Sequence, residues 1–136
     1  MKESLSNEVY PVYCLEIGRG ETDYSSVEEI ADYFKQCIDA HRCAAFIAEF
    51  DHFAHTSSLP EGRIDRDIRA ARNIVFCFGI ALPDPHALAV RPRSIGIAET
   101  TDGFFVTFME APMPLANTAV EDWAKGLRRK RAEEAA

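Results

Sequence analysis

Residues 44–55 read A-A-F-I-A-E-F-D-H-F-A-H, an apolar run that ends in an aspartate and two histidines. Side chains alternate along this run with the two-residue period of a β-strand, so it predicts a strand over residues 43–53. Its apolar content favours a central strand whose end opens into a pocket or a dimer interface. The alternation places His52 on the same face as the phenylalanines and Asp51 on the other face, provided that no bulge intervenes.

The remainder of the chain predicts four further strands. They occupy residues 9–17, 73–82, 94–100 and 104–110, which are rich in β-branched and aromatic residues and bounded by turn signals. Pro11 cannot donate a ladder hydrogen bond, which favours an edge position for the first of these strands. The strand at 73–82 is apolar on both faces and belongs in the interior of the sheet or at a buried interface. Asp102-Gly103 predicts a hairpin between the last two.

Two helices are predicted from capping residues and apolar stripes. Ser25 and Ser26 each precede a glutamate by three residues, as in a capping box, and Thr118 and Glu121 form a similar pair. The two apolar stripes are Val27, Ile30, Ala31, Phe34, Cys37 and Ile38 in the first helix, and Val120, Trp123, Ala124 and Leu127 in the second. We expect a long connection over 54–71, of a length that usually covers a site or a partner, and a short turn capped by Asp84.

The element order is therefore strand, helix, four strands, helix. Each helix has a single apolar stripe, so both can pack on one face of a largely antiparallel sheet, which predicts an α+β fold. We expect one domain over residues 1–136, with a core at 9–130 and a frayed tail at 131–136. The second sheet face would leave Phe105 and Met109 exposed in a monomer, and a patch of that kind predicts a homodimer.

The composition limits which classes of partner and which cellular compartment are expected. A net charge of −7 argues against nucleic acid as a partner, and no apolar run approaches the ~20 residues that span a membrane. Because the first ten residues lack the apolar core of a secretory signal, we expect a cytoplasmic protein. Its four cysteines are spread singly, which predicts reduced core thiols and neither a zinc ribbon nor a thioredoxin-like site. The cationic residues at 128–131 are expected to complement the carbonyl end of the last helix. The alternative interpretation is a small basic patch that binds an acidic partner.

Three segments carry a resemblance to a known family. They are Phe50-Asp51-His52-Phe53-Ala54, Phe76-Cys77-Phe78-Gly79 and the Asp102-Gly103 turn. Over about residues 44–123 the chain resembles small uncharacterised bacterial proteins and the domain of unknown function numbered three hundred and two. The resemblance implies a TATA-binding-protein-like fold and no activity, and the likeness to a DNA-binding fold implies nothing about DNA. One departure is that Ile80 follows the strand glycine, where that family usually has Asn-Pro.

The candidate site is the end of the strand at 43–53. Asp51, His52 and His55 are the only close cluster of metal-type ligands, and they could hold a divalent ion or haem. A second interpretation is a ligand pocket rimmed by the two histidines, with an aromatic wall formed by Phe46, Phe50, Phe76 and Phe78. A third is structural: His52 bonds a backbone carbonyl and Asp51 caps the segment 54–58.

Support for catalysis is weaker. A nucleophile pair would require Cys77 or Cys43 close to His52, and the apolar setting of both thiols argues against it. Arg91-Pro92-Arg93 could hold an anionic group, although a solvated turn is the expected role. We therefore expect a homodimer that binds a small ligand or a partner near His52, with no cofactor identified. The alternatives are a metal-dependent or Cys/His enzyme, and an interaction protein whose segment 54–71 docks on another subunit.

Overall fold

The computed structural model describes residues 11–110 and 113–128, which fold around a five-stranded sheet in which every neighbouring pair is antiparallel. The strands are β1 (Val12–Gly18), β2 (Ala44–Asp51), β3 (Ala70–Phe78), β4 (Arg93–Glu99) and β5 (Gly103–Met109), in the spatial order β1-β5-β4-β3-β2. The helices are α1 (Val27–Ala40), α2 (His52–Ser58) and α3 (Pro114–Lys125), with 3-10 turns η1 (Arg19–Glu21) and η2 (Pro85–Val90). The predicted α+β fold with a mainly antiparallel sheet is confirmed.

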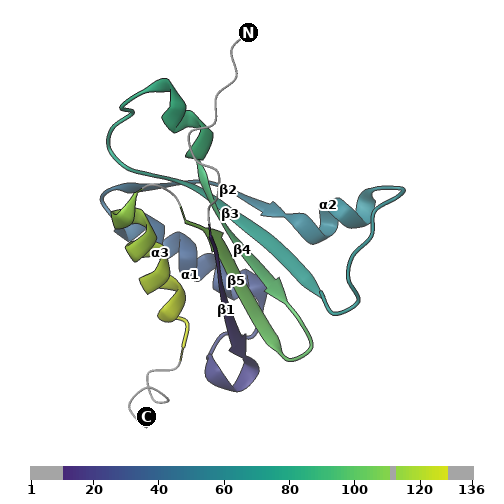
Figure 1. The fold of residues 1–136 in the computed structure, drawn as a ribbon. Helices are drawn as coiled ribbons and strands as arrows, with labels where there is room; N and C mark the ends of the chain where they lie inside the picture. The colour runs from purple at the N-terminus through teal and green to yellow at the C-terminus, as the bar shows by residue number, and fades with distance from the viewer. Residues whose placement is uncertain (1–10, 111–112, 129–136) are drawn as a thin grey trace.

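Helices α1 and α3 lie on the same side of the sheet, as their single apolar stripes predict (Figure 1). The start of α1 is the predicted one, because Ser26 Oγ accepts a hydrogen bond from the Glu29 backbone N–H at 3.2 Å. The Glu29 carboxylate in turn accepts a hydrogen bond from Ser25 Oγ at 2.7 Å. Together these bonds satisfy polar groups at the first turn of the helix.

The hydrophobic core fills the space between this helix layer and one face of the sheet. Alternate residues of the inner strands point into it and are almost fully buried. The largest of the buried side chains are Ile30, Phe34 and Ile38 from α1, Ile74, Phe76 and Phe78 from β3, Ile95 and Ile97 from β4, and Phe104 from β5. The sheet face that carries these residues is called here the covered face.

The position of β2 corrects the prediction of a central strand, because β2 forms an edge of the sheet and β4 is central. A bulge between Phe46 and Ala48 shifts the register, so Phe46 pairs with buried Phe76 while Phe50 pairs with Asn73. The bulge reverses the alternation of side chains, and the two phenylalanines of β2 therefore point to opposite faces. The first strand, β1, lies at the other edge as predicted.

Several boundaries differ from those predicted. The strand predicted over 73–82 is β3, which begins at Ala70 and ends at Phe78, so Ile80 lies outside it and is 87% exposed. The connection expected over 54–71 begins with helix α2, because Asp51 Oδ1 accepts from the Ala54 N–H at 2.9 Å and starts a helix directly at the end of the strand. Helix α3 begins at Pro114, which suits a first helical position, so Thr118 lies inside the helix instead of capping it. The turn capped by Asp84 is confirmed as η2. Residues 9–10 and 129–136, with the predicted tail and most of the basic cluster, lie outside the described residues.

Candidate functional site

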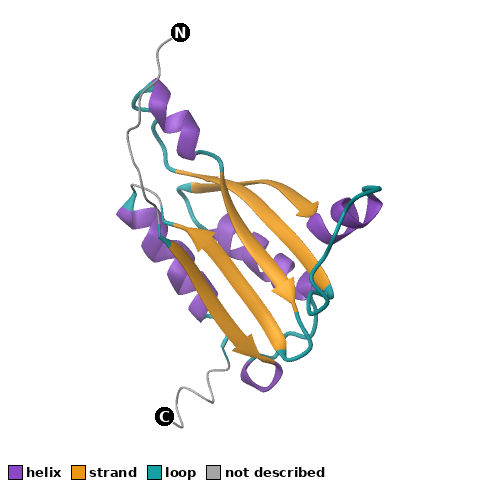
Figure 2. Cartoon of the chain, turned by 45° about the vertical axis from the view of Figure 1, so that its right-hand side comes forward, coloured by secondary structure: helices purple, strands orange, loops and turns teal. Residues whose placement is uncertain are grey.

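The second face of the sheet carries no helix from the described part of the chain (Figure 2). It is called here the open face. The register of the strands assigns to it Val12, Cys14 and Glu16 of β1; Ala45, Ala48 and Phe50 of β2; Ala71, Asn73, Val75 and Cys77 of β3; Ser94, Gly96 and Ala98 of β4; and Phe105, Thr107 and Met109 of β5. Glu16 is the one charged residue among them. Of the two residues predicted to be exposed on this face, Met109 is 54% exposed as predicted, whereas Phe105 is only partly exposed.

A short chain of neutral hydrogen bonds crosses the open face. His52 Nδ1 lies 2.9 Å from Asn73 Oδ1, and Asn73 Nδ2 donates to Ser94 Oγ at 3.1 Å. Because an amide oxygen only accepts, Nδ1 is the donor, which leaves Nε2 of a neutral His52 ring as an acceptor. The partner of His52 is thus a side-chain amide, and not the backbone carbonyl of the structural interpretation.

His52 and His55 share one aromatic neighbour. The Phe50 ring centroid lies 5.3 Å from that of His52 and 5.2 Å from that of His55, and the two imidazole centroids are 6.3 Å apart. The structure therefore brings together these three candidate residues, at the end of β2 and the start of α2. Phe50 is 41% exposed, so the cluster is open to a ligand or a partner.

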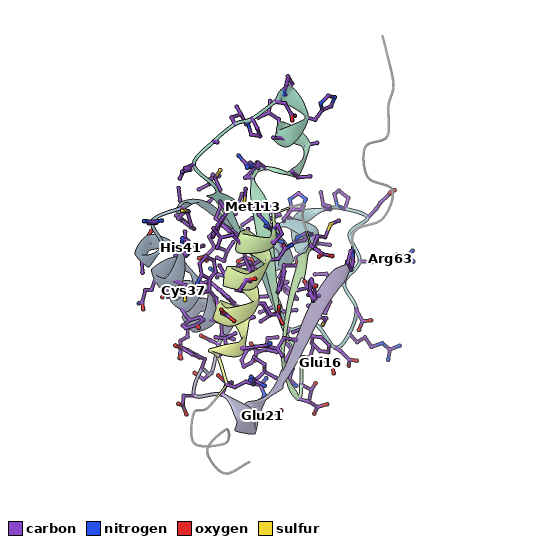
Figure 3. The ribbon with its side chains drawn as sticks, turned by 60° about the vertical axis from the view of Figure 1, so that its left-hand side comes forward. Glu16, Glu21, Cys37, His41, Arg63 and Met113 are labelled. Carbon is purple, nitrogen blue, oxygen red and sulfur yellow. The ribbon has the colours of Figure 1, made fainter. Side chains whose placement is uncertain are left out.

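A small pocket adjoins His52. Its volume is about 210 Å³, and it is lined by His52, Phe53, Thr56, Arg63, Ile64, Asp65, Ile68 and Ala71. Its outer wall is thus the segment that connects α2 to β3. Figure 3 shows Arg63 of this wall on the opposite side of the molecule from Cys37 and His41, which mark α1 and its end.

Asp51 lies apart from the two histidines. It belongs to the covered face, where its Oδ2 is 3.6 Å from Arg72 Nη2, while its Oδ1 caps α2 as the structural interpretation predicts. Among residues 11–110 and 113–128, no group of three or more His, Cys, Asp or Glu side chains is arranged to hold a metal ion. The predicted ligand set of Asp51, His52 and His55 does not converge.

The predicted aromatic wall divides between the two faces. Phe76 and Phe78 are buried on the covered face, where both pack near Trp123 with ring centroids 6.0 and 6.4 Å away. Phe46 also lies on the covered face, with Lys35 Nζ 5.4 Å from its ring centroid. Of the four phenylalanines, only Phe50 stands beside the histidines.

Neither cysteine of the alternative Cys–His pair lies beside His52 in the structure. Cys77 is on the open face, but it lies four residues along β3 from Asn73, the partner of His52, which is about 13 Å in a strand. Cys43 precedes β2, at the opposite end of that strand from His52. Neither thiol is placed to exchange a proton with this imidazole.

Glu49, the other acidic residue of β2, belongs to a network of charged side chains on the covered face. Glu49 is bonded to Arg72 and lies 2.7 Å from Lys35 Nζ, and Arg72 Nη2 is 3.0 Å from Glu28 Oε1. Burial raises the pKa of the Glu49 carboxyl, but the hydrogen bonds and charges of Lys35 and Arg72 outweigh burial and hold this pKa below its usual value. This network fastens α1 to the edge strand and is structural.

Sequence reasoning missed two polar residues and misplaced a third. Asn73 and Ser94 complete the hydrogen-bonded chain of the open face, and the available signal was a lone polar residue at the start of each otherwise apolar strand. Arg93 was assigned to a solvated turn, but it is the first residue of β4 and is only 9% exposed. The error follows from reading Arg91-Pro92-Arg93 as a unit, since the strand begins within it.

The comparisons with known proteins add one match. The model described as "Family of unknown function (DUF6858)" matches residues 1–129. This is a different family of unknown function from the one that the sequence resembles, and no relation between the two is shown. Neither the search of curated proteins nor that of solved structures gave a match, so the TATA-binding-protein-like fold stays a prediction. Within the described residues, no helix has the length and apolar character to cross a bilayer.

Proposed function

The chain belongs to this family of unknown function, and we propose that it is a small-ligand-binding protein that works as a homodimer joined through the open face. The observation that carries the proposal is that the open-face residues within the described part of the chain include one charged side chain, Glu16, although the chain has a net charge of −7. Two such chains repel each other over most of their surfaces. The open face is where two copies can meet without bringing like charges together.

Exposed apolar side chains supply a driving force for this association. Val12, Phe50 and Met109 are 65%, 41% and 54% exposed, and they lie on three different strands of the open face. Burying them against a second copy removes apolar surface from water, at about 25 cal/mol per Å². Contiguous exposed patches of this kind usually mark an interaction surface.

The size of the open face fits a second copy. Five strands about 4.8 Å apart and about seven residues long, at about 3.3 Å per residue, give a projected area of roughly 500 Å². Side chains that project from the sheet, together with α2 and η2 at its margins, make the accessible surface larger than this projected area. The surface that a second copy could bury therefore approaches the ~800 Å² per partner of a standard interface. The face is thus large enough for a specific dimer.

The middle of the face is suited to hold a small ligand between the two sheets. Ala48, Ser94 and Ala98 have small side chains, and Gly96 has none, although the Thr107 hydroxyl lies over Gly96. Two facing rows of small residues leave space at the centre, while the larger Phe50 and Met109 close the rim. Asn73 and Ser94 offer hydrogen bonds there, as ligand sites with a few polar groups do. The four free cysteines fit a reducing compartment such as the cytoplasm.

A matched pair of variants tests the interface. Phe50→Glu places a carboxylate on the open face, and Phe46→Glu places one on the covered side of the same strand, where Phe46 is similarly exposed (38%) and Lys35 is nearby. Native mass spectrometry and light scattering should show a dimer for the wild type and Phe46→Glu, and a monomer for Phe50→Glu. Ala98→Glu, on the central strand, should also give a monomer.

The outcomes separate the proposal from its rivals. A wild-type monomer contradicts the homodimer. A dimer that survives both Phe50→Glu and Ala98→Glu but is lost on deletion of residues 57–62 moves the interface to the α2 segment. Extra mass on the native dimer identifies the class of ligand directly, and His52→Ala should then remove that mass while leaving the dimer intact.

A further inference from the structure

Three large apolar side chains gather at a place other than the hydrophobic core. Phe53 of α2 and Ile64 and Ile68 of the following connection are half-buried. Among the described residues, none of the three belongs to the core or to the layer that packs against it. They line instead the pocket of about 210 Å³ that adjoins His52, which is called here the α2 pocket. Packing of the core therefore does not account for their apolar character.

The connection that forms the outer wall of the α2 pocket is held at both of its ends. A Cβ on Gly62 would lie 2.0 Å from the Thr56 carbonyl oxygen, so the connection approaches α2 closely there. Further along, the Arg69 N–H donates to the Glu99 carbonyl at 2.8 Å, which ties the connection to β4. Between these points the chain loops out beside α2 (Figure 1). Because its ends are fixed, the wall can stand without filling the space behind it.

His52 gives this largely apolar pocket a hydrogen-bond acceptor. Its Nδ1 donates to Asn73 Oδ1 at 2.9 Å, and Asn73 is held in turn by its bond to Ser94. These bonds set the tautomer of the neutral ring, so Nε2 remains available as an acceptor. Thr56 lies four residues along α2, on the same side of the helix as His52, and adds a hydroxyl to the lining.

The charges and the size of the α2 pocket favour a small neutral ligand. Arg63 and Asp65 both line it and both are exposed, so an anion or a cation would meet one attractive and one repulsive charge. A dry apolar cavity of about 150 Å³ is known to hold benzene. A volume of about 210 Å³ thus has room for one aromatic ring with a substituent.

We propose that the α2 pocket binds a small neutral aromatic molecule with one hydrogen-bond donor, of the phenol class, whose hydroxyl donates to His52 Nε2. The ring lies against Phe53, Ile64 and Ile68 and removes their remaining apolar surface from water. Two aromatic residues, His52 and Phe53, offer the offset or edge-to-face contacts that favour an aromatic body over an aliphatic one. An acceptor-only ligand is disfavoured because it would meet the acceptor Nε2.

The α2 pocket is distinct from the ligand space proposed between two sheets, because its lining comes from residues 52–71 of one chain. The two inferences can therefore fail separately. Met109→Glu places a charge on the open face, outside this pocket, and should give a monomer that binds phenol as the wild type does. A wild-type monomer that binds phenol contradicts the homodimer alone. Loss of phenol binding in a folded Met109→Glu monomer contradicts a site within one chain.

Titration of the full chain with phenol and with anisole, followed by calorimetry and by NMR of the imidazole nitrogens, tests the proposal. One phenol per chain should bind and shift the Nε2 resonance of His52. Anisole has the same ring without the donor and should bind about fivefold more weakly. His52→Phe keeps a ring but removes the acceptor, so it should bind the two molecules equally. Absence of phenol binding, equal binding by the wild type, or a phenol preference that survives in His52→Phe overturns the proposal.

A matched pair of alanine variants tests the location of the site. Ala71→Phe introduces a ring at a residue that lines the pocket, and Ala54→Phe introduces the same ring at an exposed residue of α2 outside it. Only Ala71→Phe should lose the binding of both phenol and anisole. Wild-type affinity in Ala71→Phe contradicts the location, as does a loss in a folded Ala54→Phe protein.

Benzoate tests the neutral class of the ligand. Its carboxylate has the same ring but only accepts hydrogen bonds, so it should bind more weakly than phenol. Benzoate that binds more tightly than phenol, and loses this advantage in Arg63→Gln, would show that the exposed guanidinium governs the site. That result overturns the proposal of a neutral ligand.

Discussion

The two faces of the sheet are built from the same strands but differ in how deeply their side chains are buried and in how their polar groups are paired. In β3, Ile74, Phe76 and Phe78 are fully buried against the helix layer, whereas the intervening Asn73 and Val75 remain partly exposed. Polar groups also differ: the covered face pairs charges, as between Arg72 and Glu49, while the open face carries only the neutral bonds from His52 to Ser94. The difference indicates that the covered face supplies most of the folding stability, and it supports the binding role that we propose for the open face.

The largest expected effect comes from cutting a buried side chain on the covered face. Phe76→Ala removes a ring that packs near Trp123 and should lower the free energy of unfolding by about 3–5 kcal/mol. Its neighbour Val75 points to the open face, and Val75→Ala should cost about 1 kcal/mol or less. Urea unfolding at low protein concentration, where the chain is monomeric, measures both.

Raising the protein concentration sharpens this comparison. If the open face joins two copies, Val75→Ala should cost more at high concentration than at low, because Val75 is then buried in the interface. The cost of Phe76→Ala should not depend on concentration in this way. Equal costs for the two variants at low concentration would contradict the division of roles between the faces.

Much of the covered face could be predicted from sequence, and little of the open face could. Alternation identifies the buried Ile74, Phe76 and Phe78, and the stripe identifies the buried residues of α1, because both patterns record contact with the core. The same alternation wrongly includes Ile80, which follows the end of β3 and is 87% exposed. The open face carries no such requirement within one chain. Its bonded partners, His52 and Asn73, are 21 residues apart, and nothing local signals that they meet.

The position of β2 shows why the candidate site was only partly predictable. Alanines at 45 and 48 count as apolar but bury little surface, so the strand can lie at an edge. The bulge after Phe46 depends on how β3 pairs with β2. This single inserted residue places Phe50 on the face of the sheet opposite to that of Phe76. The composition of the stretch was therefore informative about its type of structure, but not about which side chains share a face.

A smaller effect is expected from opening the charged network. Arg72→Met leaves Glu49 without one of its two cations and removes the contacts with Glu28 and Asp51. We expect a loss of about 2 kcal/mol, since a half-buried carboxylate keeps its desolvation cost but loses a charged partner. The control on the open face is Asn73→Ala, which breaks neutral, exposed bonds and should cost about 1 kcal/mol or less. Thermal unfolding compares the two, and a larger loss for Asn73→Ala would contradict the comparison.

The smallest expected effect is a pH dependence confined to the covered face. The pKa of Glu49 in the folded protein lies below its ordinary value of 4.5, because Lys35 and Arg72 outweigh the effect of burial. The ionised form is thus favoured by folding, so this contribution is complete well above pH 4.5 and is lost as the pH falls through the folded pKa. Glu49→Gln removes it, and the stability gap between wild type and variant, measured by urea unfolding, should be widest near neutral pH and shrink below pH 4.5. The gap between wild type and Asn73→Ala should change less between pH 4.5 and pH 3, because neither Asn73 nor Ser94 titrates. A Glu49→Gln gap that is the same at pH 7 and pH 3 would show that the network adds no charge-dependent stability, and would leave packing alone to distinguish the covered face from the open one.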